Sequence, residues 1–303
     1  STSLSTHLLI LLSSLLFPTA LLSQSAGNTL SILNWSEYID PEVIKGFELH
    51  YSARVKVSYF ENDELRDQVM LNSEGKGYDL VLSNGVAVST YAHLGWLEPI
   101  PKDAIPNLKH IDSHWSKSFE ASERYGVPYF WGTLGIVYRS DKTLTPVDSW
   151  AKLLKPDDTL KGRILMIEDS DELIGAALKS LGYSLNSSDS AQLNQAAELL
   201  MHQKSYVKEY ATLTLLEDSP IVTGEVWAAM TYNGDALMVK EFNDSIEYVL
   251  PAEGSAIWVD YFTVLSSSNN KDLAYKFLDY INDPEINAKN VQYVYSATPN
   301  KAA

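Results

Sequence analysis

Two short segments, far apart in the chain, each pair a tryptophan with a carboxylic acid. One is NWSEY at residues 34–38, and the other is WVD at residues 258–260. If the second segment is extended, Trp258 and Asp260 share one face, because side chains two residues apart point the same way along a strand. A Trp face attracts an ammonium group through the ring quadrupole, and a carboxylate adds a charge-assisted hydrogen bond. The two segments therefore predict a pocket for a protonated amine; the competing interpretation is that both tryptophans are core residues.

Asp260 is the acid least easily explained by structure alone. It lies inside the apolar run 256–265, where an unpaired charge costs on the order of several kcal/mol. We therefore expect a buried partner or a cationic ligand against this carboxylate. In a site for an aliphatic diamine, paired carboxylates must offset the desolvation of two ammonium groups, and aromatic walls must contact the methylenes between them.

The composition is that of an ordinary globular protein with an acidic excess. The chain has 303 residues, of which 45% are hydrophobic and 20% charged, and its net charge is −16. This length is enough for two domains with separate cores. The negative charge disfavours nucleic acid and anionic membrane surfaces as partners, because both require basic patches.

The N-terminus predicts export. Residues 8–22 form an apolar run that is too short and too interrupted by proline to span a membrane. We interpret residues 1–25 as a signal peptide, although its first residues lack Lys and Arg. The chain contains no cysteine and hence no disulfide, thiolate metal site or lipid-modified cysteine. These features predict an exported, unanchored protein of a periplasm.

Strands and helices are expected to alternate through the first part of the mature chain. Expected strands cover residues 29–33, 55–59 and 78–82, and expected helices begin at Pro41 behind an Asp40 cap and cover residues 62–71. The alternation predicts an α/β fold with a mostly parallel sheet and helices on both faces. Ligands of such sheets bind beyond the carboxyl ends of the strands, where residues 35–38 fall.

A second α/β unit is expected after Trp131-Gly132. Expected strands cover residues 135–138, 163–167 and 256–265, and expected helices begin at Ser149-Trp150 and cover residues 169–181, 191–203 and 273–280. Residues 132–138 are the expected crossing between two lobes. The segment YNGD at residues 232–235 favours a turn, and Asp283-Pro284 is expected to close the last helix.

In this order, the segments resemble the polyamine-binding proteins of spermidine/putrescine ABC importers, which are periplasmic solute receptors. The resemblance covers nearly all of residues 29–300 and is carried by LNWSEY at 33–38, YDLV at 78–81, VPY at 127–129, WG at 131–132, SWA at 149–151, LGY at 181–183, TGEV at 223–226, NG at 233–234, WVD at 258–260 and TPN at 298–300. It implies a type II periplasmic binding protein, in which two lobes close about a hinge on a ligand in the cleft between them. The implied first lobe is residues 26–134 with 257–297, and the second is residues 135–256 with 298–303.

The resemblance also implies roles for individual residues. Trp35, Tyr38, Tyr232 and Trp258 would be aromatic walls, and Ser36, Glu37, Asn84, Asp169, Glu172, Asp235, Asp260 and Ser296 would be polar contacts of a linear polyamine. No catalytic residue, metal or cofactor is implied. The implied partners are the polyamine and the permease and ATPase of an importer in the inner membrane, with the receptor acting as a monomer.

Several departures from the family pattern bear on the ligand. Asn84 and Val86 stand where the family often has Ser and Tyr, Tyr232 stands where Trp is usual, and Ser296 replaces a pocket Tyr. The chain also ends soon after residues 298–300, where relatives continue through a helical tail, so either the sequence continues beyond residue 303 or this lobe is trimmed. These departures leave open a receptor for another organic cation, such as thiamine or a modified amine.

Some of the acids have purely structural alternatives. Asp169 would begin a helix, where a carboxylate is a routine N-cap, and Glu172 could complete a capping box with it. Asp235 could be a turn residue, and Glu37 could simply be exposed. A glycoside hydrolase also uses tryptophan and two carboxylates in a cleft, and it is a distant alternative because these acids follow a two-lobe receptor pattern.

Overall fold

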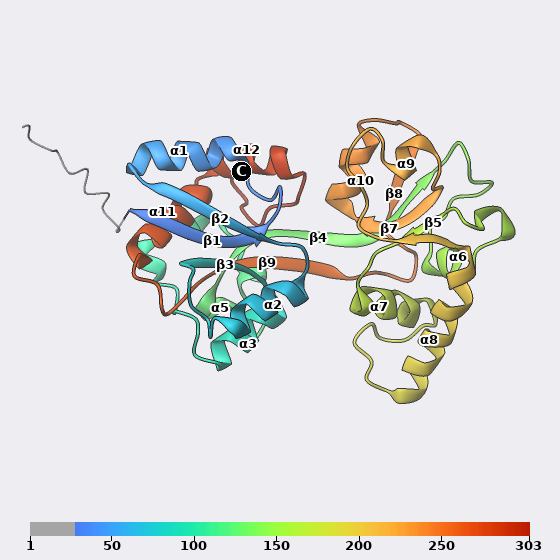
Figure 1. Ribbon diagram of the computed structural model, residues 1–303, viewed down its shortest axis with the longest axis horizontal. Helices are drawn as coiled ribbons and strands as arrows, with labels where there is room; N and C mark the ends of the chain where they lie inside the picture. Colours follow the sequence, from blue (N-terminus) through green and yellow to red (C-terminus); the bar gives the residue numbers. More distant parts are fainter. Residues whose placement is uncertain (1–27) are drawn as a thin grey trace, which may run out of the picture.

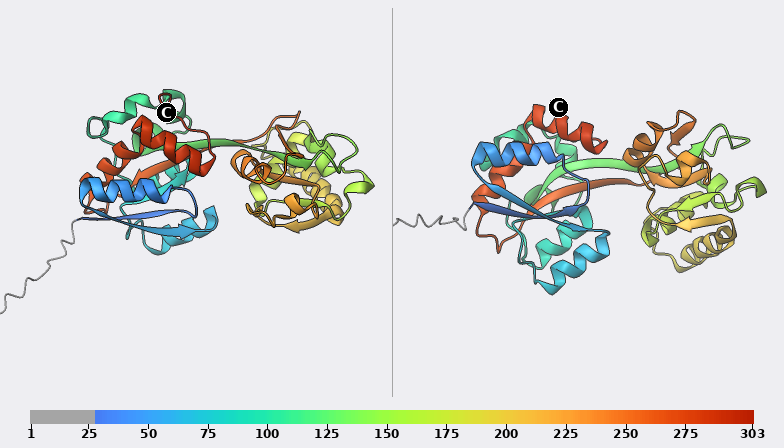
Figure 2. Two further views of the ribbon diagram at one scale, coloured as in Figure 1. Left: turned by 90° about the horizontal axis from the view of Figure 1, so that it is seen from above. Right: turned by 45° about the horizontal axis from the view of Figure 1, so that its top comes forward.

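The computed structural model describes residues 28–303, which form two lobes joined by two long strands (Figure 1). The joining strands are β4 (Gly126–Arg139) and β9 (Ile257–Val264), and the two further views show the same pair of bodies linked in the same way (Figure 2). Among residues 28–303, no helix is both long enough and apolar enough to cross a membrane. The expected signal peptide, residues 1–25, lies outside the described residues.

The sheet of the first lobe has the strand order β2-β1-β3-β9-β4. Its other strands are β1 (Thr29–Trp35), β2 (Arg54–Phe60) and β3 (Leu80–Asn84). β1 pairs in parallel with β2 and β3, as the sequence predicts, whereas β9 returns from the second lobe and is antiparallel to both β3 and β4. The helices of this lobe are α1 (Pro41–Tyr51), α2 (Asp63–Asn72), α3 (Gly85–His93), η1 (Lys102–Ala104), η2 (Pro106–His110), α4 (Ser113–Ser116), α5 (Ser122–Tyr125), α11 (Lys271–Ile281) and α12 (Pro284–Val294).

The sheet of the second lobe is built around the C-terminal half of β4, which pairs with β7 and with β8. The path continues from β7 to β5 and β6. Its strands are β5 (Ile164–Met166), β6 (Val207–Tyr210), β7 (Ala228–Tyr232) and β8 (Ile246–Val249), and its helices are α6 (Trp150–Leu154), η3 (Asp158–Leu160), α7 (Ser170–Ser180), α8 (Ser190–Gln203), η4 (Lys204–Tyr206), α9 (Pro220–Thr223) and α10 (Asn233–Lys240).

Strand alternation gives each sheet a separate core on either face. In the first lobe, Leu30 and Ile32 are buried with α1 and α11, whereas Leu33 packs on the opposite face with residues of α2 and α3. In the second lobe, one core lies under α6, α7 and α8 and the other under α9 and α10. Each lobe therefore has hydrophobic cores of its own, as is typical of separate domains.

The crossing between the lobes lies inside β4. Residues through Thr133 pair with β9, and residues from Leu134 onward pair with β7. The β4–β9 register also shifts between Pro128 and Trp131, just before the crossing. The change of partner falls within residues 132–138, where the sequence predicts the crossing, and β4 runs through it as one continuous strand.

The structure corrects one expectation about local organisation and extends another. Asn233 begins helix α10, so residues 232–235 are not a turn between extended segments. Asp283 does not only end α11, because its carboxylate accepts hydrogen bonds from the backbone of Glu285 (3.0 Å) and Ile286 (3.3 Å) and so begins α12. An Asp-Pro pair is equally suited to the first turn of a new helix.

The expected place of residues 298–303 in the second lobe is also wrong. Pro299 O accepts from Asp112 N (3.0 Å), and Lys301 N donates to His110 O (2.9 Å). The Asn300 side chain is buried and donates to Asn282 O (2.8 Å). These contacts place residues 299–301 against the first lobe rather than the second.

Candidate functional site

Asp260 and Tyr38 meet where β9 leaves the first lobe. The Tyr38 hydroxyl donates to Asp260 Oδ2 (2.9 Å), and burial raises the pKa of Tyr38, so the hydroxyl stays a donor. Burial also raises the pKa of Asp260 to about 7, against the lowering effect of the Tyr38 hydrogen bond. Among residues 28–303, the Tyr38 hydroxyl is the one side-chain hydrogen-bond partner of this carboxylate, and burial disfavours its full negative charge. A cation placed here would restore the charged form.

Trp258 and Asp260 occupy alternate positions of an extended strand, as the sequence predicts. Val259 and Tyr261 between and after them are buried in the opposite face, with 4% and 0% exposure. The Trp258 ring contacts Tyr232, at the end of β7 in the second lobe, edge to face with the centroids 6.1 Å apart. Two aromatic walls thus meet at the crossing, one from each sheet.

Gly132 is the backbone position that lets these rings approach β4. A Cβ at Gly132 would lie 2.5 Å from the Trp258 ring and 2.4 Å from Asn233 Oδ1. The same Asn233 oxygen accepts from Thr133 N (3.0 Å), so the amide has little freedom to move away. Glycine is therefore required by close packing between β4, β9 and α10.

We expect Gly132→Ala to cost about 1–3 kcal/mol of folding stability, because the added methyl group overpacks this contact. It should also weaken ligand binding by displacing Trp258. The measurement is thermal unfolding together with a ligand titration. The matched control is Gly175→Ala in α7, where the nearest atom to an added Cβ is 3.7 Å away. That variant should be neutral or slightly more stable; equal losses in both variants would contradict this packing argument.

The second lobe supplies two acids at the start of α7. Asp169 caps the helix, accepting from the backbone of Asp171 (3.0 Å) and Glu172 (3.1 Å), as its structural alternative predicts. Glu172 is half-buried, and burial raises its pKa to about 7, with further raising by the charges of Asp169, Asp171 and Asp63. Both capping hydrogen bonds use Asp169 Oδ1. Because a carboxylate accepts through both of its oxygens, capping leaves Asp169 Oδ2 able to accept from a ligand.

The start of α10 carries Asp235 and is approached by Ser296 from the end of α12. Asp235 is in the first turn of this helix, and burial raises its pKa to about 6, against a smaller lowering by the Thr231 hydroxyl. A Cβ added to the neighbouring Gly234 would lie 2.9 Å from Tyr295 O and 3.7 Å from Ser296 Oγ. This contact brings the end of α12 in the first lobe against the helix that carries Asp235.

The remaining residues of the NWSEY segment are placed less favourably for a buried ligand. Trp35 ends β1 and packs on Phe60, with the ring centroids 4.5 Å apart. Ser36 and Glu37 are exposed, and Glu37 has a positive φ of 56°. The Tyr293 hydroxyl donates to Glu37 Oε2 (2.6 Å), so this acid is tied to α12.

Asn84 is engaged by protein groups at both ends of its amide. Its oxygen accepts from Ala87 N (2.8 Å), which caps α3, and its nitrogen donates to Asp63 Oδ2 (2.8 Å). In the β3–β9 ladder, Asn84 lies directly opposite Asp260. The structure therefore adds Asp63 to the neighbourhood of the predicted acids.

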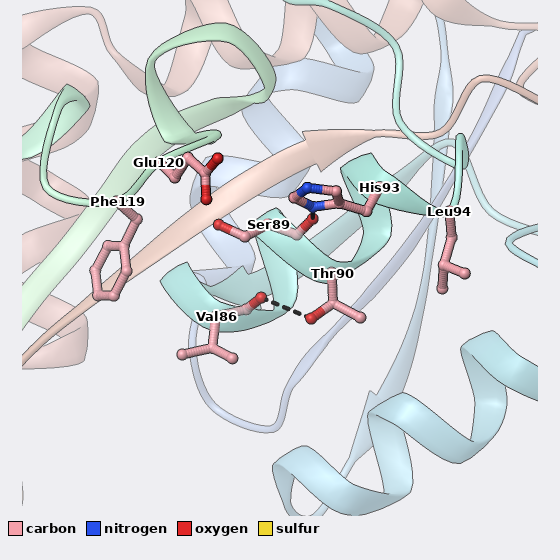
Figure 3. Close-up of a pocket in the computed structure, with 7 residues that line it drawn as sticks. All are labelled: Val86, Ser89, Thr90, His93, Leu94, Phe119 and Glu120. Carbon is pink, nitrogen blue, oxygen red and sulfur yellow. Dashed lines mark hydrogen bonds between the residues drawn. The ribbon is translucent and has the colours of Figure 1, made fainter. Parts of the chain in front are cut away.

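Val86 lines a surface hollow rather than the predicted site. The hollow lies over α3 and has a volume of about 520 Å³. Figure 3 shows the residues that line it, which are Val86, Ser89, Thr90, His93, Leu94, Phe119 and Glu120. Two polar side chains of the lining form hydrogen bonds with the backbone of α3 itself. Thr90 Oγ1 donates to Val86 O (3.0 Å), and His93 Nδ1 lies 2.8 Å from Ser89 O. With one carboxylate in a mainly apolar lining, the hollow does not have the chemistry of a polyamine site.

Carboxylates and aromatic rings from both lobes thus gather at the crossing strands. Asp260, Trp258 and Tyr38 come from the first lobe, whereas Glu172, Asp235 and Tyr232 come from the second. The charge of Asp63 raises the pKa of Asp260 and of Glu172, in each case as a smaller contribution than burial, so acids of both lobes act on one another. This arrangement suits a ligand with several positive charges separated by apolar segments.

The family follows from comparison with known sequences. Residues 42–303 match the family of bacterial extracellular solute-binding proteins. The chain belongs to this family. The spermidine/putrescine-binding periplasmic protein of Salmonella typhimurium is 30% identical to this solute-binding protein over 284 residues, which cover 92% of this chain and 80% of the relative. The putrescine-binding periplasmic protein PotF of Escherichia coli is 28% identical over 310 residues, covering 94% and 83%.

Solved structures agree with this family and with its two-lobe α/β fold. A Listeria monocytogenes protein, provisionally assigned to a spermidine/putrescine ABC transporter, has 34% identity and a TM-score of 0.83, covering 91% of this chain and 84% of its own. The substrate-binding protein PotD of a Streptococcus pneumoniae spermidine/putrescine ABC transporter has 29% identity and a TM-score of 0.77, covering 90% and 83%. The expected family and fold class are confirmed, and the family is one of transport receptors rather than enzymes.

Proposed function

We propose that this solute-binding protein captures a polyamine of the putrescine or spermidine type between its lobes and delivers it to an ABC importer. The observation that carries the proposal is Asp260, a carboxylate with a strongly raised pKa that lies beside the Tyr38 hydroxyl and on the same strand face as Trp258. A protonated amine supplies the positive charge that this group lacks. The names of the relatives support the same class of ligand.

The second lobe supports binding of more than one amine. Glu172 and Asp235 are further carboxylates with raised pKa values, and Tyr232 meets Trp258 at the crossing. In our proposal the ligand binds first to one lobe, the hinge within β4 and β9 closes, and the closed form docks on the permease. The proposed protein acts as a monomer outside the cytoplasmic membrane, in the periplasm where its relatives are named, and residues 1–25 direct its export.

The proposal is tested by titrating a protein of residues 26–303 with a panel of ligands. Binding is monitored by tryptophan fluorescence and by calorimetry. The panel contains putrescine, cadaverine, spermidine and spermine, with thiamine as a different organic cation and 1,4-butanediol as an uncharged analogue of putrescine. We expect saturable binding of at least one polyamine at micromolar or lower concentration and no response to the diol. Binding of thiamine alone, or equal binding of putrescine and the diol, would overturn the proposal.

A further inference from the structure

Asp63 is an acid that the sequence motifs did not single out. It is the first residue of α2, directly after the Asn62 cap and close to the end of β2. In Figure 1, α2 lies on the part of the first lobe that faces the second, below the joining strands, and α7 lies on the facing part of the second lobe. The oblique view places them in the same way (Figure 2).

Asn84 fixes Asp63 next to the site. Its amide oxygen is held by Ala87 N, so the amide nitrogen is directed toward Asp63 Oδ2, 2.8 Å away. Asn84 is also the direct cross-strand partner of Asp260. Asn84 therefore binds the Asp63 carboxylate of α2 from the strand position directly opposite Asp260 of β9.

A buried arginine, Arg66, also binds Asp63 but does not fully neutralise the carboxylates around it. The Arg66 side chain is 1% exposed and forms ion pairs with both Asp63 and Asp67. Its guanidinium lies over the rings of Phe60 and Tyr91, 5.6 and 6.0 Å from their centroids. Two carboxylates around one guanidinium leave a net negative charge, and the Asp63 side chain is 41% exposed and accessible to a ligand.

Asp63 also acts on acids of both lobes. Burial is the main cause of the raised pKa of Asp260 and of Glu172, and the charge of Asp63 adds to both. It adds in the same way to the raised pKa of Tyr232. Since unit charges interact appreciably only over short range in a solvated protein, these effects place Asp63 among the residues of the site.

We propose that Asp63 is a further ligand-binding carboxylate, which together with Glu172 of the second lobe holds one ammonium group of the polyamine. This inference rests on the proposed function. Asn84 and Arg66 act as positioning residues that fix the carboxylate on the first lobe. In the empty protein the two like charges oppose approach of the lobes, and a bound ammonium group offsets that repulsion, so ligand binding and lobe closure are coupled at this point.

The test compares Asp63→Asn with Asp67→Asn by calorimetric titration with spermidine. Both changes remove one carboxylate of Arg66, but only Asp63 is bound to Asn84. We expect Asp63→Asn to weaken spermidine binding at least about tenfold and to reduce its salt dependence, because a direct charged contact is lost. Asp67→Asn should stay within about twofold of the unmodified protein.

Thermal unfolding of both variants separates a binding effect from a folding effect. If the two substitutions weaken spermidine binding equally, the effect belongs to Arg66 and α2, and the role of Asp63 is overturned. Unchanged spermidine affinity in Asp63→Asn would overturn it as well. If the unmodified protein binds no polyamine, the proposed function fails and this inference fails with it. If the unmodified protein binds spermidine and only the Asp63 comparison fails, the proposed function stands.

Discussion

Asp260→Asn is expected to remove most of the polyamine binding and, at the same time, to stabilise the ligand-free protein at pH 8. Removing one partner of a buried charged hydrogen bond costs about 2–5 kcal/mol of binding free energy. Asparagine keeps an oxygen that can accept from the Tyr38 hydroxyl, 2.9 Å from the carboxylate, so the local packing is preserved. The loss of affinity then reports the charge of this residue rather than its shape.

The gain in stability follows from the sign of the pKa shift. Burial raises the pKa of Asp260 from 3.8 to about 7, so the folded protein binds more protons than the unfolded chain between these values. The favourable contribution of Asp260 to the free energy of unfolding is complete below about pH 4 and is lost as the pH rises toward and through 7. Asparagine carries no charge at any of these pH values. Without ligand at pH 8, the variant should therefore unfold at a higher midpoint temperature than the unmodified protein.

The control for Asp260 is Asp79→Asn, at the opposite end of the first-lobe sheet. Asp79 is buried, and its carboxylate accepts from Ser31 N (2.7 Å) and the Ser268 hydroxyl (2.6 Å). Here the charge has protein donors, so the substitution should leave ligand affinity nearly unchanged and should not raise the midpoint. If both variants bind polyamine normally, Asp260 is not a ligand contact.

The second large effect is a fall in polyamine affinity as the pH decreases from 8 to 5.5. Burial raises the pKa of Asp260 and of Glu172 to about 7 and that of Asp235 to about 6. Aliphatic ammonium groups stay charged throughout this range, so the change comes from the protein. Below pH 6 each protonated carboxyl must release its proton before it binds an ammonium group. We expect about a tenfold to hundredfold loss of affinity across this range.

Proton release provides an independent measurement of the same effect. Calorimetric titrations at pH 6 in buffers of different ionisation enthalpy should show protons released on binding, and fewer should be released at pH 8. Asp260→Asn should reduce the number released at pH 6. An affinity that is constant from pH 5.5 to 8 would contradict the assignment of these three acids to the site.

The elements with clear sequence signals were predicted well. Alternating apolar residues and capping residues predict β1, β2 and the starts of α1 and α6 close to where they lie. The shared face of Trp258 and Asp260 follows from strand periodicity alone, and the structure confirms it. The family resemblance then connects these local features into a two-lobe receptor, which neither periodicity nor composition could do.

The features that sequence reasoning missed depend on contacts between distant segments. Asp63 stands in a run of polar residues at a helix start, which is ordinary for a first turn. Its hydrogen bond to Asn84, the cross-strand partner of Asp260, depends on the tertiary fold. Asn233-Gly234 is a common turn signal, but here Asn233 begins helix α10, whose start packs closely against residues 295–296 and Gly132. The partners of residues 298–303 could not be read from these residues alone.

A crystal structure of residues 26–303 grown with spermidine would test the central claim most directly. The account predicts an amine nitrogen within hydrogen-bond distance of Asp260, the Trp258 and Tyr232 rings against the methylenes, and a second nitrogen between Asp63 on the first lobe and Glu172 on the second. Spermidine bound to one lobe only, or with its nitrogens away from Asp260, would contradict the claim that carboxylates of both lobes form a single polyamine site.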